Sequence, residues 1–389
     1  MKALKHLTFT LFLVLSHLLL PAQESQSLEF TLQSDAFGGA RKIKVYLPES
    51  YSKDTTSNFV VTYILDAQSP ELWDMAKGNI GYMVRQRLVL PMIAVGIVSE
   101  DRGSEFNPNS SELREHLQKE VFPFIEKQFR TENFRIIVGH SWGGAFVGNT
   151  LFGPNRDLFD AYLGISPSLG ALGGIIFDQA AKMLAEKQVF KKYCYVSTGD
   201  IGFREQESIW DVLQVDSIIQ KYPNESLVWK YERFEKADHW SCVIPSLQNG
   251  LIAISRNYFA DQSILEGFAQ NKTLSIGEQM ESFYQEKEER FGFTHPVNGQ
   301  YLNFVADDFR QQGNYSAAKE MLLASFDHGN KNTASYFNLA LCYEELHDPS
   351  MAKATFEKAS IVLEEQKDQV SERFYNALGK AIKEKLKQY

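Results

Sequence analysis

The stretch FRIIVGHSWGGAFVGNTLFG, from Phe134 to Gly153, places a serine between glycines where a β-branched run gives way to a helical one. Isolated glycines weaken both strands and helices, so their presence at this point needs a reason. The pentapeptide from Gly139 to Gly143 fits the pattern G-x-S-x-G, in which a tight turn exposes the serine hydroxyl. Side chains in place of these two glycines are expected to collide with neighbouring backbone. The position between a strand and a helix therefore predicts a nucleophile elbow at Ser141.

Short β-rich runs alternate with helical runs from Leu28 to about Tyr258. The candidate strands are LEFTLQS, KIKVYLP, FVVTYILD, MIAVGIV, FRIIVGH, AYLGIS, YCYVSTG and LVWKYERF. Helical patterns such as SSELREHLQKEVFPFIEKQF and EQESIWDVLQVDSIIQKY lie between them. Several later strands are apolar almost throughout, as strands covered on both faces are. This order predicts an α/β domain over residues 27–258, with a mostly parallel sheet, helices on both faces and an antiparallel hairpin at one edge.

The β signal ends near Asp261, and the remaining residues have helical spacing and composition. The segments LNFVADDFRQQGNYSAAKEMLLAS and YFNLALCYEELHDPSMAKATFEKA superimpose with a shift of 34 residues, which aligns Leu302 with Tyr336. Period and pattern resemble those of tetratricopeptide repeats. We therefore predict an all-α region that consists of a helical linker over 259–298, two repeats over 299–366 and a closing helix over 367–389.

The N-terminus has the composition of a secretory signal peptide. Lys2, Lys5 and His6 precede a mainly apolar run from Leu7 to Leu20, and PAQESQS follows. A basic start, about 14 apolar residues and a small residue at the cut are typical of such peptides. A membrane anchor is the alternative, but the run is short for a span of about 20 residues. We predict cleavage after Ala22, which makes the mature protein secreted or periplasmic and leaves it without a membrane span.

The mature chain is acidic, because the loss of Lys2 and Lys5 takes the formal net charge from −9 to −11. This charge, without a basic stripe, argues against binding to nucleic acid or to an anionic membrane surface. The cysteines, Cys194, Cys242 and Cys342, are widely spaced and odd in number, so they do not form the pattern of a metal site. A disulfide between Cys194 and Cys242 would suit an oxidising compartment.

A serine hydroxyl needs a base that removes its proton, and in this fold the acid and then the histidine follow the serine along the chain. His239, in YERFEKADHWSCVIPSLQNGL, follows the last predicted strand and is the expected base. The acid should follow the strand YCYVSTG. Asp200 comes first after it and is the preferred candidate, and Glu205 and Glu207 on the next helix are the alternatives.

The oxyanion hole requires two N–H donors directed at the carbonyl oxygen of the substrate. One should be the backbone N–H of Trp142, directly after the serine. The other should come from the loop YILDAQSPELW, at Ala67 or Gln68. Trp240 adjoins the expected base, which makes it a candidate for contact with the substrate.

Five segments occur in a recognisable order: KIKVYLPESY, YILDAQ, DRGSEFNP, EVFPFIEKQFRTENFRIIVGHSWGG and DHWSCVIPSLQNGL. Through them, residues 28–255 resemble the putative-esterase family of α/β-hydrolases, which includes esterase D and enterochelin-type siderophore esterases. The resemblance implies an α/β-hydrolase fold, with Ser141 as nucleophile and His239 as base. It also implies that Arg102 lies near the substrate pocket. The sequence departs from the family at Ala67, where glycine is usual.

These features predict a serine hydrolase that cleaves carboxylic esters through an acyl-enzyme on Ser141 and needs no metal or cofactor. The expected substrate is a small-molecule ester, such as a siderophore lactone, an acylated sugar or a short synthetic ester. The alternative is a partner-binding protein whose helical repeats bind a protein, with the hydrolase domain as scaffold or as cargo brought to a complex. The intact serine, histidine and glycine turn favour the enzyme.

Overall fold

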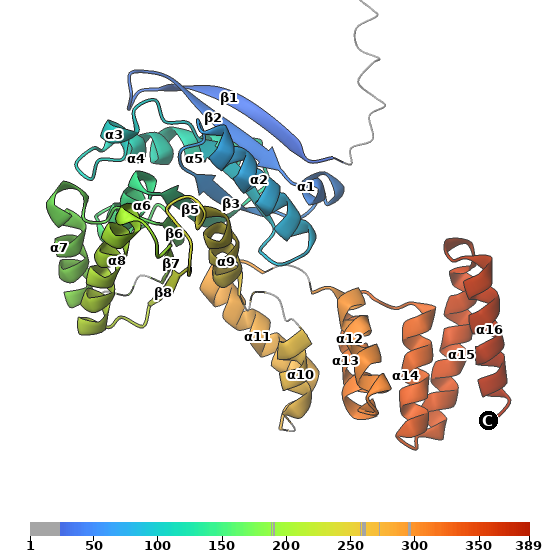
Figure 1. The fold of residues 1–389 in the computed structure, drawn as a ribbon. Coiled ribbons are helices and arrows are strands. Elements are labelled where there is room, and N and C mark those ends of the chain that lie inside the picture. Colours follow the sequence, from blue (N-terminus) through green and yellow to red (C-terminus); the bar gives the residue numbers. More distant parts are fainter. Residues whose placement is uncertain are drawn as a thin grey trace, which may run out of the picture. The chain divides into compact units, whose positions relative to one another are not determined.

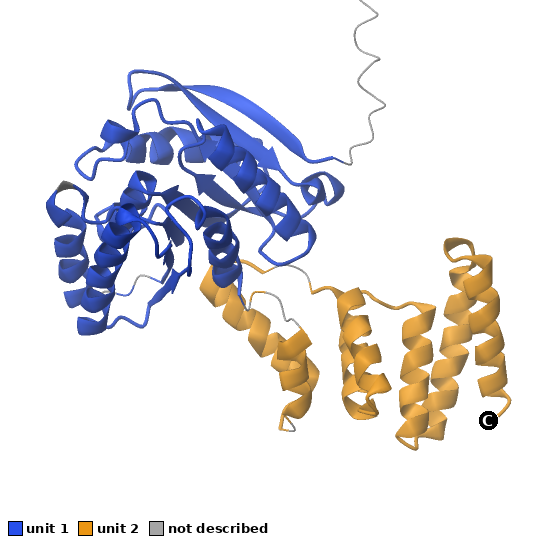
Figure 2. Cartoon of the chain, in the orientation of Figure 1, with its two compact units in different colours: residues 1–256 blue, residues 257–389 orange. Residues whose placement is uncertain are grey.

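The structure is a computed structural model that describes residues 24–187, 189, 191–256, 258, 262–271, 273–294 and 297–389. The chain divides into two compact units, residues 1–256 and 257–389 (Figure 2). The predicted signal peptide, residues 1–22, lies outside the described residues. Among the helices of the described ranges, none is long and apolar enough to cross a membrane.

The first unit is built on an eight-stranded sheet in the order β1-β2-β4-β3-β5-β6-β7-β8 (Figure 1). Strand β1 pairs antiparallel with β2, and β2 pairs antiparallel with β4, whereas the other neighbours are parallel. The predicted mostly parallel sheet with a hairpin at its edge is therefore confirmed. The strands are β1 (Gln26–Ser34), β2 (Gly39–Leu47), β3 (Phe59–Ile64), β4 (Met92–Ile97), β5 (Thr131–His140), β6 (Ala161–Ile165), β7 (Lys192–Thr198) and β8 (Leu227–Arg233).

Helices cover both faces of the central strands, which is why β3, β4, β6 and β7 are buried at every position. Tyr162 and Cys194 belong to the core under α6–α8. Leu163 and Tyr195, each one residue further along its strand, lie against Gly250 on the opposite side. The helices of this unit are α1 (Glu49–Lys53), α2 (Pro70–Arg85), α3 (Arg102–Glu105), α4 (Glu112–His116), the π-helical turn η1 (Leu117–Val121), α5 (Phe122–Gln128), α6 (Trp142–Phe152), α7 (Ala171–Ala185), α8 (Phe203–Lys221) and α9 (Val243–Ser255).

The second unit is all-helical in its described residues. After two helices, α10 and α11, one helix pair begins at Gly299 and Tyr315, and the next pair begins 34 residues later, at Thr333 and Pro349. The small residues at equivalent positions of the pairs are fully buried, namely Ala306 with Ala340 and Ala318 with Ala352. The predicted all-helical region is confirmed, and its assignment to tetratricopeptide repeats stays a prediction. The elements are α10 (Gln262–Gln270), α11 (Ile276–Phe291), α12 (Gly299–Gln311), α13 (Tyr315–Asp327), α14 (Thr333–Glu345), α15 (Pro349–Glu365), the short turn η2 (Lys367–Gln369) and α16 (Glu372–Leu386).

All three cysteines are buried free thiols, so the disulfide considered between Cys194 and Cys242 does not form.

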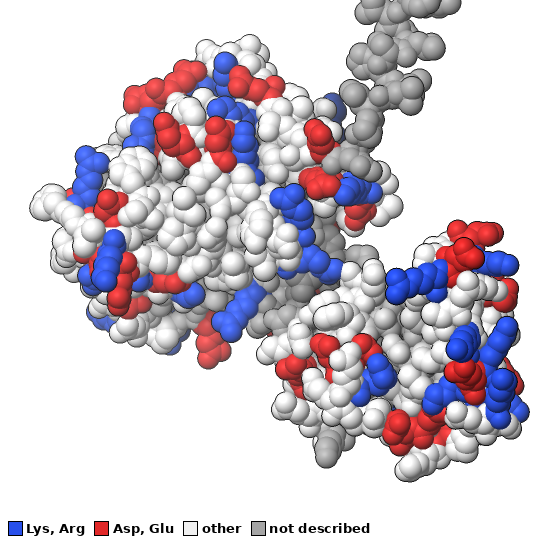
Figure 3. Space-filling model, turned by 45° about the vertical axis from the view of Figure 1, so that its right-hand side comes forward, with Lys and Arg blue, Asp and Glu red and all other residues white. Residues whose placement is uncertain are grey.

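The surface charges are mixed. On the face shown in Figure 3, acidic and basic side chains are interspersed in small groups. Some of the exposed charges pair along one helix, as Lys119 does with Glu115 at 2.7 Å. Such exposed pairs contribute about 0–1 kcal/mol each to stability.

Candidate active site

Ser141 occupies a strained turn between strand β5 and helix α6. Its φ of 58° and ψ of −115° lie in a region that costs a residue with a side chain about 1–3 kcal/mol. Neighbouring backbone holds the turn on both sides. The Ser141 N–H donates to the Ile165 carbonyl at 2.9 Å, and the Ser141 carbonyl accepts from Ser168 N–H at 3.1 Å. The predicted strand-to-helix turn is present, and Ser141 lines a pocket.

The turn needs glycine at two positions, and only one of them belongs to the predicted pair. A Cβ at Gly139 would lie 2.3 Å from the Gly143 carbonyl oxygen, and one at Gly144 would lie 2.6 Å from Pro167. At Gly143 the nearest atom would be 3.3 Å away, at the end of the Asp66 side chain. The expectation of a backbone collision at Gly143 is therefore wrong, because the close approach to α6 falls one residue later.

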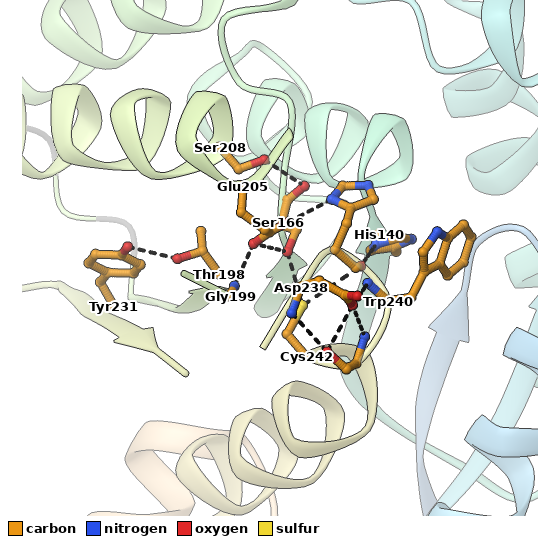
Figure 4. Close-up of polar contacts among 12 residues, drawn as sticks. His140, Ser166, Thr198, Gly199, Glu205, Ser208, Tyr231, Asp238, Trp240 and Cys242 are labelled. Atoms are coloured by element: carbon orange, nitrogen blue, oxygen red, sulfur yellow. Dashed lines mark hydrogen bonds and ion pairs between the residues drawn. The ribbon is translucent and has the colours of Figure 1, made fainter. Parts of the chain in front are cut away.

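His239 lies in the loop between β8 and α9 and lines the same pocket as Ser141. Its ring is largely buried. The loop is closed by Asp238, whose Oδ1 accepts hydrogen bonds from the N–H groups of Trp240 and Ser241 (Figure 4). The Nδ1 atom of His239 lies 2.6 Å from Oε1 of Glu205. Nε2 is thus the ring nitrogen that remains for the serine.

Glu205 is the third residue of α8 and is fully buried. Its second oxygen, Oε2, accepts from the Ser166 hydroxyl at 3.0 Å and from the Gly199 N–H (Figure 4). Burial raises the pKa of Glu205, but the hydrogen bonds from His239, Ser166 and Gly199 outweigh burial and hold this pKa below its ordinary value of 4.5. The group is therefore a carboxylate at neutral pH and can stabilise a protonated His239.

The carboxylate in contact with His239 is that of Glu205, one of the two alternatives, and not that of Asp200, the preferred acid of the sequence analysis. The N–H groups of Asp200 and Ile201 both donate to the Ala237 carbonyl, at 2.8 and 3.1 Å, which folds the end of β7 into a turn. Oδ1 of Asp200 has no hydrogen-bond partner among the described residues. The other alternative, Glu207, is exposed and lines the pocket without binding His239.

A signal for Glu205 was present in the sequence. Glu205 shares one helical face with Ser208, Ile209 and Val212, which are all buried. A glutamate on the apolar stripe of a helix, at spacings of three, four and seven, is out of place unless it has a buried partner. This pattern distinguishes Glu205 from Glu207, which lies on the exposed side.

His140, the residue before the nucleophile, supports His239 and was not predicted from the sequence. Its Nε2–H donates to the His239 carbonyl at 2.8 Å. Its ring centroid lies 4.5 Å from that of His239 and 4.9 Å from that of Trp240. Burial, with His239 nearby, lowers the pKa of His140 to about 4. At neutral pH His140 therefore holds the loop without placing a positive charge beside His239.

The pocket in front of Ser141 is open and has a volume of about 1140 Å³. Trp240, predicted to contact the substrate, is not among its lining residues; its ring is 60% exposed and packs on His140. Aromatic and charged side chains of both signs form the wall. The lining residues are Arg102, Ser141, Trp142, Ser168, Gly170, Ala171, Gly173, Gly174, Phe177, Arg204, Gln206, Glu207, Ser208, Trp210, Asp211 and His239.

The three predicted oxyanion donors, Trp142, Ala67 and Gln68, have different surroundings in the structure. Trp142 is the first residue of α6, so its N–H points out of the helix N-terminus beside Ser141. The Ala67 N–H instead donates to the Ile97 carbonyl at 3.0 Å, and the prediction for Ala67 is therefore wrong. The Gln68 side chain bridges Asp66 Oδ1 and the Ser99 N–H, at 2.8 and 2.9 Å. Its backbone stays a predicted donor, although Gln68 does not line the pocket.

Arg102 lines the pocket as predicted, but its guanidinium group is bound to Asp66. Nε and Nη2 donate to the two carboxylate oxygens at 2.8 and 3.0 Å. The Asp66 carboxylate is almost fully buried, whereas Arg102 is 44% exposed. A buried carboxylate close to Gly143 would oppose negative charge at the start of α6, so the arginine neutralises it.

We expect Arg102→Ala to lower the free energy of unfolding by about 1–2 kcal/mol, because it leaves Asp66 buried without a counter-charge. The rate of ester hydrolysis should fall as well. Adding Asp66→Asn to this variant removes the uncompensated charge and should restore most of both losses. Thermal unfolding and steady-state kinetics on the single and double variants measure this. If Arg102→Ala raises KM and the double variant keeps that raised KM, Arg102 binds the substrate instead of neutralising Asp66.

Comparison with known proteins identifies a family for the first unit and solved structures with a similar fold. A family model described as Putative esterase matches residues 34–240. Solved structures similar to the chain include an IroE-like serine hydrolase from Shewanella oneidensis, with a TM-score of 0.63 and 18% identity over 78% of this chain and 99% of that one. A siderophore hydrolase, EstB, from Aspergillus nidulans has a TM-score of 0.52 and 18% identity over 61% and 96%.

Another similar structure covers almost the whole chain. An uncharacterised protein from Capnocytophaga ochracea has a TM-score of 0.70 and 15% identity, covering 92% of this chain and 99% of its own. At such identities the likeness to solved structures shows the fold alone. No curated protein sequence matches the chain significantly.

Proposed function

The chain belongs to the Putative esterase family, and we propose that it cleaves carboxylic esters through an acyl-enzyme on Ser141. The observation that supports this most directly is the 2.6 Å contact between His239 Nδ1 and the buried Glu205 carboxylate, in a pocket that Ser141 also lines. A buried carboxylate that fixes one ring nitrogen leaves the other as the base for a serine hydroxyl. The strained backbone of Ser141 presents that hydroxyl to the substrate.

The proposed reaction has two halves. Ser141 Oγ attacks the ester carbonyl while His239 Nε2 takes its proton, and the same proton passes to the leaving alcohol. Water then attacks the acyl-enzyme carbonyl while His239 Nε2 takes its proton, and this proton passes to Ser141 Oγ as the bond to the acyl group breaks and the carboxylic acid leaves. Glu205 accepts a hydrogen bond from Nδ1–H of His239, which keeps that proton on Nδ1 and leaves Nε2 free to act as the base. The negative charge of Glu205 also stabilises the imidazolium that forms in both halves of the reaction. The Trp142 N–H at the start of α6 donates to the oxyanion.

The proposed substrate is a small-molecule ester that the open pocket admits. The side chains of Trp142, Phe177 and Trp210 line the pocket and offer aromatic surface to an acyl or aryl group. The solved siderophore hydrolase of the same fold makes siderophore esters one class to assay, beside acylated sugars and short synthetic esters. With the N-terminal segment as a signal peptide, this activity belongs outside the cytoplasm, and the helical second unit is proposed as the site of any protein partner.

Hydrolysis of p-nitrophenyl acetate and butyrate by residues 23–389 tests the proposal. We expect turnover well above the rate in buffer, and covalent labelling of Ser141 by a fluorophosphonate, because the pocket holds an activated serine. Mass spectrometry of the labelled peptide identifies the site. A protein that neither hydrolyses the esters nor takes up the label would contradict the proposal and favour the partner-binding alternative.

A further inference from the structure

The last residue of strand β6 and the turn after it, residues 165–168, contact both the proposed nucleophile and the proposed acid. The Ile165 carbonyl accepts from Ser141 N–H at 2.9 Å, and Ser168 N–H donates to the Ser141 carbonyl at 3.1 Å. Between these two residues, the Ser166 hydroxyl donates to Oε2 of Glu205 at 3.0 Å. Four consecutive residues therefore hold the nucleophile from its backbone and the acid from its side chain.

Ser166 has a backbone conformation that an ordinary buried turn would avoid. Its φ is 39°, in the left-handed region, and the residue is fully buried. Such strain persists only where the surroundings fix it, and it is concentrated at functional sites. Here the Ser166 N–H donates to the Ser197 carbonyl at 2.7 Å, and its carbonyl accepts from the Ser208 hydroxyl at 3.2 Å.

The hydroxyl of Ser166 has one proton to donate, and its neighbours decide where that proton goes. A carboxylate can only accept, so the proton lies on the side of Glu205. The Cys242 Sγ lies 3.1 Å from the same oxygen, on another side (Figure 4). Burial raises the pKa of Cys242 to about 11, so its thiol keeps a proton and can donate to Ser166.

We propose that Ser166 is a positioning residue, which locks the Glu205 carboxylate so that one oxygen faces His239. This inference rests on the proposed function. The Ser166 hydroxyl and the Gly199 N–H both donate hydrogen bonds to Oε2, which leaves Oε1 to accept from Nδ1 of His239. Without the Ser166 hydroxyl, Oε2 accepts a hydrogen bond from the Gly199 N–H only, and the carboxylate can rotate away from the His239 ring.

Two substitutions separate the hydroxyl of Ser166 from its backbone. Ser166→Ala should lower kcat about tenfold with KM little changed, which is the effect of one lost hydrogen bond to a charged group. Ser166→Gly should lose as much activity but unfold at a temperature no lower than the alanine variant, because glycine adopts a φ of 39° without strain. Ester kinetics and thermal unfolding on both proteins measure this.

The pH profile distinguishes positioning from a purely structural role. The donors hold the pKa of Glu205 below its ordinary value, so removal of one donor raises it. The acid then loses its charge at a higher pH, and the ratio of variant to wild-type kcat/KM should fall further as the pH drops below about 5. A structural defect would lower the ratio equally at every pH at which the protein stays folded.

Ser197→Ala is the matched control, because it also deletes a buried hydroxyl beside the turn. The Ser197 hydroxyl has no hydrogen-bond partner among the described residues, so wild-type kcat and a flat pH ratio are expected. Wild-type kcat in either Ser166 variant, or a loss that does not depend on pH, overturns the inference and leaves the esterase intact. A wild-type protein without turnover or fluorophosphonate labelling overturns the proposed function, and this inference with it.

Discussion

Ser141→Ala is expected to lower kcat/KM for p-nitrophenyl acetate by about four to six orders of magnitude. The hydroxyl is the proposed nucleophile, and alanine offers no atom that can form the acyl-enzyme. What remains should come from the Trp142 N–H and the pocket acting on a water molecule. Initial-rate kinetics and a fluorophosphonate label measure the loss, and circular dichroism shows whether the protein stays folded.

His239→Ala provides the companion measurement. Its loss should be of similar size, and the variant that lacks both Ser141 and His239 should be no worse than either single one, because the two side chains act as a unit. His328→Ala, an exposed histidine of the second unit, is the control with wild-type activity expected. Independent, additive losses from Ser141→Ala and His239→Ala would contradict a shared proton transfer.

The fold was predictable because the central strands of its sheet are buried on both faces. Strands such as β3 and β4 are apolar at nearly every position, and that continuous burial is visible in FVVTYI and MIAVGI. Each of the eight predicted runs overlaps one strand of the sheet. The candidate nucleophile was also visible, since the glycines of its turn are local in sequence. His239 followed from the order of elements along the chain.

The remaining parts of the site depend on contacts between residues far apart in the chain. Asp200 was preferred because it is the first acidic residue after β7, but its N–H binds the Ala237 carbonyl and its Oδ1 has no hydrogen-bond partner among the described residues, whereas Glu205 contacts the histidine. Glu205 reaches His239 because α8 begins right after Gly202, which has a φ of 95°. Likewise, the Ala67 N–H is taken by a carbonyl of the neighbouring strand β4. Residue order in the sequence does not reveal such pairings.

Glu205→Gln is expected to lower kcat by about three to four orders of magnitude with KM little changed. The amide keeps the shape of the side chain but removes the charge that stabilises protonated His239. If its NH₂ group faces Nδ1, the ring must also take the wrong tautomer. Steady-state kinetics between pH 6 and 9 measure the loss, which should persist across this range because glutamine does not titrate.

Asp200→Asn is the matched control for this change, since it also replaces a carboxylate near the end of β7 with an amide. Activity within about twofold of the wild type is expected, because Asp200 makes its described contacts through the backbone. The comparison decides between two acids that are five residues apart. A large loss in Asp200→Asn with a mild one in Glu205→Gln would mean that the acid contact is remade during turnover, with the α8 turn moving to bring Asp200 to the histidine. The reverse pattern would establish that the buried glutamate on the apolar face of α8 serves as the acid.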